Sequence, residues 1–107
     1  MGESWREQKQ PAKAVRALQE AVRLKPDDAD LWVRLGIAYD DLQDHSRAIS
    51  AYRQAISVEP DNVSAWYLLG LQYAEQDNRA GITAVYPQLK RLDPARAEDF
   101  FKAFVLP

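Results

Sequence analysis

The sequence predicts an all-α protein built from consecutive helix pairs, and a repeat with a constant period of 34 positions supports this prediction most directly. Trp, Leu, Gly, Tyr, Tyr and Pro recur in this order as Trp32, Leu35, Gly36, Tyr39, Tyr52 and Pro60, and again as Trp66, Leu69, Gly70, Tyr73, Tyr86 and Pro94. Between these positions, apolar residues follow spacings of three and four, which are typical of amphipathic helices. A fixed period of this length indicates a stack of similar helical units.

Length and composition exclude several classes of function. The chain has 107 residues and a net charge of −2 with acids and bases interspersed, so it has no field that would attract nucleic acid. It contains no cysteine, which excludes disulfides, thiolate metal sites and a cysteine nucleophile. No apolar run approaches the roughly 18 residues that span a bilayer, and the first residues do not resemble a signal peptide. We expect a soluble domain, and both the cytoplasm and the periplasm remain open.

The period continues backwards into an incomplete first unit. Gly2 takes the place of Gly36, whereas the Trp of this unit would precede the chain. We expect a shortened helix over 2–8 and a second helix over 12–25, with Pro11 in its first turn, where the missing N–H costs nothing. We interpret the chain as an excised piece of a longer protein, and the alternative is a domain with a degenerate start.

Complete helix pairs are expected in the centre of the chain, over 29–42 with 47–58, and over 63–76 with 79–92. Asp27 or Asp28 is expected to cap the first of these helices, and Asp44 or Ser46 the second, by accepting hydrogen bonds from free backbone N–H groups. A glycine in the middle of a helix, such as Gly36, costs about 1 kcal/mol relative to alanine. Its presence predicts a close approach of the partner helix.

The pattern changes after Pro94, where the Trp and the Gly of the repeat are lost. A short helix is still expected over 95–105, with one apolar face formed by Ala97, Phe101, Phe104 and Val105. Phe100 lies outside this face and is expected to be exposed or to reach around to Leu71 and its neighbours. Such a helix covers the last pair, which would otherwise leave an apolar surface in water.

The period and the residues that recur resemble the tetratricopeptide repeat family. The resemblance implies a right-handed α-solenoid of antiparallel helix pairs, with about two full repeats, a truncated first repeat and a C-terminal capping helix. A single domain over 1–107 would then divide into segments 1–28, 29–62, 63–94 and 95–107. The family implies a scaffold without catalysis: a protein–protein interaction module that binds a peptide or helical segment of a partner protein on its concave face.

In this family the first helix of each pair lines the concave side, so residues there that do not serve the core are candidate partner contacts. These are Val33, Arg34, Ile37, Asp40, Asp41, Tyr67, Leu68, Leu71 and Glu75. The apolar members form a patch rimmed by acids, a pattern that often marks partner sites. Arg34 is expected to bind an acidic group. For Leu68 and Leu71 the alternative role is packing between neighbouring repeats.

The sequence gives little support for a carboxylate clamp, a metal site or a catalytic site. One subfamily binds the C-terminal carboxylates of chaperones with a clamp of Lys, Asn and Arg, but the corresponding positions hold Glu3, Arg34, Ser64 and Leu68. The single histidine, His45, follows Asp44 in a turn, and we interpret it as a surface residue in preference to a metal ligand. No catalytic set, phosphate loop or nucleotide fingerprint is present, so we expect no cofactor and no metal.

Self-assembly is the alternative function. A start within a repeat would leave the apolar edge of the helix over 12–25 poorly covered. A second copy could cover that edge and give a homo-oligomer.

Overall fold

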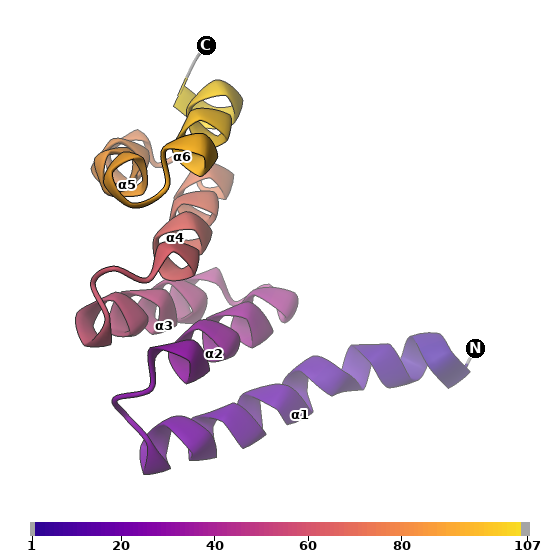
Figure 1. Cartoon of the computed structure of the whole chain (residues 1–107). Coiled ribbons are helices and arrows are strands. Elements are labelled where there is room, and N and C mark those ends of the chain that lie inside the picture. The colour runs from indigo at the N-terminus through magenta and orange to yellow at the C-terminus, as the bar shows by residue number, and fades with distance from the viewer. Residues whose placement is uncertain (1, 106–107) are drawn as a thin grey trace. The chain divides into compact units, whose positions relative to one another are not determined.

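The computed structural model describes the backbone of residues 2–105 and the side chains of residues 12–104. All of the regular structure in the described part is helical (Figure 1). Its contacts divide the chain into two compact units, unit 1 over residues 1–60 and unit 2 over residues 61–107. Each unit is described by itself below. Within the described residues, none of the helices has the length and apolar character needed to cross a bilayer.

Unit 1 begins with one long helix, α1 (Gly2–Leu24), where the sequence predicted two. This prediction was wrong, because the helix continues through Pro11 and no turn separates 2–8 from 12–25. The repeat suggests a physical reason. The later turns each have a capping residue, Asp44 or Asn78, and the residue one period before Asp44 is Gln10. Glutamine is not among the residues that cap a helix N-terminus well, so nothing in the sequence starts a new helix there.

The remaining helices of unit 1 are α2 (Ala29–Asp41) and α3 (His45–Val58), which form an antiparallel pair. Of the expected caps, Asp28 accepts from the N–H groups of residues 30 and 31, and Asp44 accepts from that of residue 47. The turn between the helices depends on Gln43, whose φ of 64° lies in the left-handed region. This conformation lets the N–H of Asp44 donate to the carbonyl of Tyr39 at 2.9 Å, which closes the end of α2.

The core of unit 1 forms where α1 and α3 pack on α2. One cluster joins Val15 and Val22 of α1 to Leu35 and Ala38 of α2 and to Ala51 of α3. In the α2–α3 pair, Tyr52 is 1% exposed and lies directly over Gly36. A side chain at Gly36 would place its Cβ 2.7 Å from Cδ1 and 2.9 Å from Cζ of this ring. The close approach predicted from the mid-helix glycine is therefore present.

Unit 2 contains a second antiparallel pair, α4 (Val63–Glu75) and α5 (Arg79–Leu92), followed by α6 (Pro94–Phe100) and a π-helical segment, η1 (Phe101–Val105). The caps again follow the repeat, because Asn62 and Asn78 stand one period after Asp28 and Asp44. Asp77 adopts the left-handed conformation with φ of 54°, as Gln43 does in unit 1.

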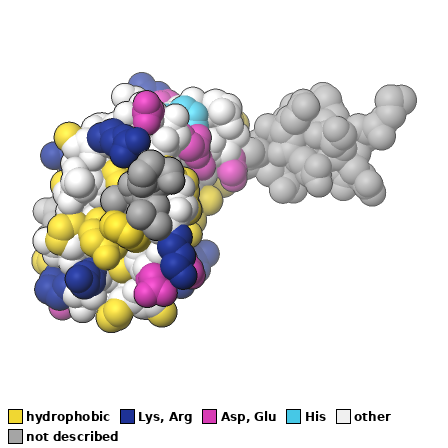
Figure 2. Space-filling model, turned by 90° about the horizontal axis from the view of Figure 1, so that it is seen from above, with side chains coloured by type: hydrophobic (Ala, Val, Ile, Leu, Met, Phe, Trp, Pro, Cys, Tyr) yellow, Lys and Arg dark blue, Asp and Glu magenta, His cyan; other side chains and the backbone are white. Residues whose placement is uncertain are grey.

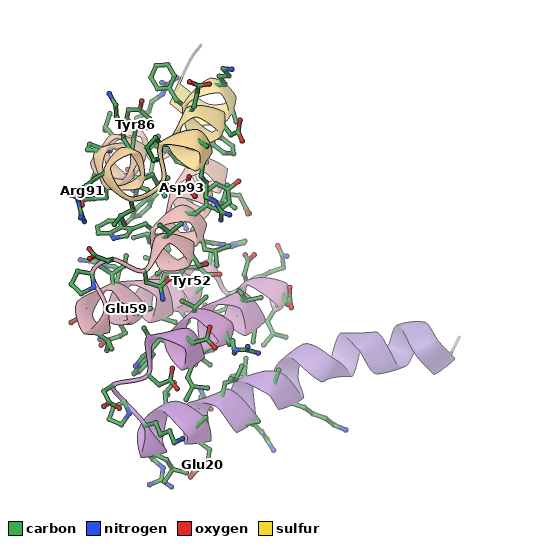
Figure 3. All side chains as sticks on the ribbon, viewed as in Figure 1. Glu20, Tyr52, Glu59, Tyr86, Arg91 and Asp93 are labelled. Carbon is green, nitrogen blue, oxygen red and sulfur yellow. The ribbon has the colours of Figure 1, made fainter. Side chains whose placement is uncertain are left out.

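The ring that lies over the central glycine of α4 comes from a different helix than in unit 1. Tyr86, the repeat equivalent of Tyr52 (both labelled in Figure 3), is only half-buried and packs on Phe101 with ring centroids 5.2 Å apart. Phe100 takes its place over Gly70, together with Val85 of α5. Phe100 is 1% exposed, so of the two alternatives exposure was wrong, and the ring reaches Gly70, the neighbour of Leu71. It therefore belongs to the buried face of the last helix, from which the apolar spacing had excluded it.

The contact between Gly36 and Tyr52 gives a direct test of this packing. We expect Gly36→Ala to lower the free energy of unfolding by about 1–3 kcal/mol, because the buried ring has no room to move away from the new methyl group. This loss opposes the gain of about 1 kcal/mol that alanine brings to a helix. Urea denaturation measures the difference, with Ser57→Ala on the exposed side of α3 as the control. An unchanged or higher stability of Gly36→Ala would contradict the packing.

Candidate functional site

The candidate contacts on α2 form a strip along one side of the helix. Arg34, Ile37 and Asp41 are separated by three and four residues, which places them on neighbouring turns. The Ile37 side chain is 41% exposed, an unusual position for a large apolar residue, and Arg34 and Asp41 beside it are both exposed. Arg34 Nε donates to Asp30 Oδ2 at 2.8 Å. This hydrogen bond, with the charge of Asp30, raises the pKa of Arg34.

Two predicted members of this set are placed differently by the structure. Val33 is only 6% exposed, which corrects the expectation that it contributes to an exposed apolar patch. Asp40 is half-buried, and its Oδ1 lies 3.1 Å from Nδ1 of His45. That contact connects the end of α2 to the start of α3, so both residues of the pair serve the turn between the helices.

The candidate contacts on α4 form a second strip. Tyr67, Leu68 and Leu71 are half-buried and Glu75 is exposed, and spacings of three and four place them on successive turns. Leu68 and Leu71 therefore keep part of their apolar surface in water. Figure 2 displays one face of the molecule, on which hydrophobic side chains are grouped with Lys, Arg, Asp and Glu around them.

Within this strip, the ring of Tyr67 contacts two residues of α6. The guanidinium of Arg96 lies 5.0 Å from the centre of its ring, within the range of a cation–π interaction. The ring of Phe100 meets it edge-on, with centroids 6.3 Å apart. Beside these contacts is an open groove of about 440 Å³, lined by Tyr67, Asp93, Ala95, Arg96 and Asp99. Arg96 Nε also lies 3.7 Å from Asp93 Oδ2.

Sequence reasoning missed Arg96 and Phe100 as neighbours of Tyr67. The signal was present, because Phe100 stands one period after Trp66 and so occupies the Trp position of the repeat. Ala97, which is 1% exposed, occupies the position of Ala29 and Val63 in the same way. The expected face of the last helix was chosen from apolar spacing alone, which favoured Phe101 over Phe100.

Comparisons with known proteins agree with the helical-repeat fold. The family model described as tetratricopeptide repeat matches residues 6–70. A crystal structure of MamA is similar to this chain, with a TM-score of 0.76 and 29% sequence identity over 83% of this chain and 52% of that one. A second crystal structure of the MamA protein has a TM-score of 0.70 and 28% identity over 91% and 50% of the two chains. The chain thus spans about half the length of these proteins. No curated protein matches it. The expected solenoid of helix pairs is confirmed.

The different exposures of Val33 and Ile37 predict different costs of truncation. We expect Val33→Ala to lower the free energy of unfolding by about 1–2 kcal/mol, because it removes buried methyl groups and leaves a cavity. Ile37→Ala, at a partly exposed position, is expected to change it by less than about 1 kcal/mol. Urea denaturation of both variants measures the difference. Equal losses would show that the two side chains are packed alike.

Proposed function

The chain belongs to the tetratricopeptide repeat family, and we propose that it binds a peptide or helical segment of a partner protein on the concave side of its repeats. Tetratricopeptide repeats are in general protein–protein interaction modules, and the fold is generally non-catalytic. The observation that best supports the proposal is Ile37, a large apolar side chain 41% exposed in the middle of α2. An apolar residue with charges beside it matches the usual composition of a partner site.

On α2, we assign Ile37 the apolar contact and Arg34 the polar contact. Arg34 already pairs with Asp30, but both side chains are well exposed, at 64% and 69%. Exposed ion pairs contribute little to stability, so a carboxylate of the partner can replace Asp30 at small cost. Asp41, one turn after Ile37, would favour a basic residue at the other end of the same segment. The expected partner sequence therefore has an apolar residue between an acidic and a basic one.

On α4, Leu68 and Leu71 are assigned the apolar contact and Glu75 a charged one. Tyr67 adds an aromatic ring with a hydroxyl group, a side chain that is enriched at protein interfaces. Packing against the neighbouring repeat remains the alternative role of Leu68 and Leu71. Each strip lies on a helix of its own unit, so each can be disrupted by a substitution of its own.

Selection from a random-peptide library tests the proposal while the natural partner is unidentified. We expect peptides selected on the wild-type chain to bind Ile37→Asp and Leu71→Asp at least about tenfold more weakly, since a carboxylate in the contact opposes burial. Arg53→Glu, an exposed change on α3, is the control and is expected to keep the affinity. Isothermal titration gives the affinities, and circular dichroism verifies that each variant is folded.

Three results would count against this assignment. Binding of the selected peptides to both variants as tightly as to the wild type would place the binding surface elsewhere. Loss of binding by Arg53→Glu would show a general electrostatic effect in place of a defined surface. Unfolding of Ile37→Asp or Leu71→Asp would show that the substituted residue is structural.

Self-association is a second candidate function, and the uneven burial of equivalent helix faces favours it. On α3, the residues that pack against α2 are almost fully buried, namely Ala48, Ala51, Tyr52 and Ala55. Their equivalents on α1, one period earlier, are exposed or half-buried, namely Ala14, Ala17, Leu18 and Ala21. Leu24, at the end of the same helix, is 70% exposed. Ala14 and Leu18 already pack in part against the core cluster of unit 1, and a helix from a second copy would cover the part of this face that stays exposed.

Sedimentation measures self-association directly. We expect the average mass of the wild-type chain to rise with concentration into the high micromolar range, and Ala17→Glu to prevent this rise. Ala17 is exposed, so its substitution should leave the fold of the single chain intact. A wild-type chain that stays monomeric over the whole range would eliminate this candidate.

A further inference from the structure

We propose that α6 is a resident ligand of the surface around Tyr67 and Gly70 on α4, and that a helical partner segment with an arginine four residues before a phenylalanine displaces it. This inference rests on the proposed function in one respect, because Tyr67 is one of the assigned partner contacts. It adds a specific partner chemistry and a competition between that partner and the chain's own last helix.

The first contact that defines this chemistry is the ring of Phe100. It is 1% exposed and lies over Gly70, where an added Cβ would come within 2.8 Å of Cε1 and Cζ. Val85 forms the other wall, 3.0 Å from the same point. Because Gly70 has no side chain, a flat aromatic group fits between Gly70 and Val85, and we call this space the seat. The seat is formed by α4 and α5, and α6 only fills it.

The second contact is the cation of Arg96 over the ring of Tyr67, 5.0 Å from its centre. Arg96 and Phe100 are four residues apart, so they lie on the same side of one helix. Tyr67 and Gly70 are three residues apart on α4 and receive them in the same order. The carboxylates of Asp93 and Asp99 line the groove beside Tyr67, and their charge favours a basic group over a neutral one at this place.

The shape of α6 suits it to exchange. Together with η1 it forms a helical segment over residues 94–105, and isolated helices shorter than about 12–15 residues are marginal in water, so its structure depends on the surface that it covers. Asp93 alone separates it from α5, and after Phe100 the chain changes to the π-helical segment η1. An incoming helix with the same two side chains would replace the contacts that Arg96 and Phe100 make with Tyr67 and Gly70. The face of the Tyr67 ring that Arg96 and Phe100 cover is therefore available to a partner only when these two side chains leave it.

The experiment uses a fluorescein-labelled peptide with the sequence of residues 93–105 as the probe, and the whole chain as the receptor. Phe100→Ala in the receptor empties the seat. Arg96→Ala removes the cation–π contact between α6 and Tyr67. We expect Phe100→Ala to bind the probe about tenfold more tightly than the wild type or better, because the site is then no longer occupied in most molecules. Arg96→Ala should show a smaller gain. The probe should also raise the melting temperature of Phe100→Ala more than that of the wild type.

The matched control is the double variant Phe100→Ala with Gly70→Ala, whose methyl group fills the seat while α6 stays released. It should lose the gain in affinity, and so should a probe that carries Phe100→Ala. If Phe100→Ala does not fold alone, recovery of its helicity when it is refolded with the probe supports the inference. Equal affinity of wild type and folded Phe100→Ala, equal affinity of the single and double variants, or no recovery on refolding would overturn it.

Because the probe replaces the unknown partner, this result and the proposed function can fail separately. A probe that binds the vacated seat while library peptides ignore Ile37 and Leu71 would leave the inference standing without the proposed function. Probe binding that instead joins two receptor copies, seen as a dimer of Phe100→Ala in sedimentation, would contradict displacement by a partner segment.

Discussion

A ring packed on the backbone of a glycine is the contact on which both units depend. Helices pack at about 8–10 Å when side chains separate them, and a glycine permits the ring to reach the helix surface itself. In unit 1 the ring is Tyr52 over Gly36, and in unit 2 it is Phe100 over Gly70. Glycine weakens the helix that carries it, so its presence at both positions is explained by packing and not by helix formation.

The ring over the central glycine comes from a different helix in each unit, which changes what surrounds the proposed binding surface. In unit 1 the ring belongs to the pair itself, since Tyr52 lies on α3. In unit 2 the ring over Gly70 belongs to the helix that follows the pair, and Tyr86 packs on Phe101 of η1, while within the pair Tyr73 of α4 lies over Gly81 of α5. The last helix is consequently held by the core of unit 2. It also reaches the candidate contact Tyr67, so stability and the proposed partner binding share residues at this end of the chain.

The constant period and the capping residues predicted the helices from 29 to 92 closely, because the same local signals occur in both copies. The first helix was predicted incorrectly, since Pro11 suggested a start while Gln10 gave no cap. The role of Phe100 was also missed, although its distance from Trp66 equals the period. For the site, spacing identified the side of α2 that carries Ile37 and Arg34, but burial of Val33 depends on packing that a helical pattern does not specify. Whether these residues contact a partner depends on chemistry outside this chain.

The burial of Phe100 has a genetic consequence. Segments beyond the last regular pair of a domain are often poorly ordered, and their loss is then tolerated. Here a stop codon at any position from 93 to 100 would leave both helices of the preceding pair translated in full, yet it would delete the ring over Gly70. Water would then reach the space between α4 and α5. Such a nonsense mutation would therefore destabilise unit 2 in the same way as the loss of a core side chain.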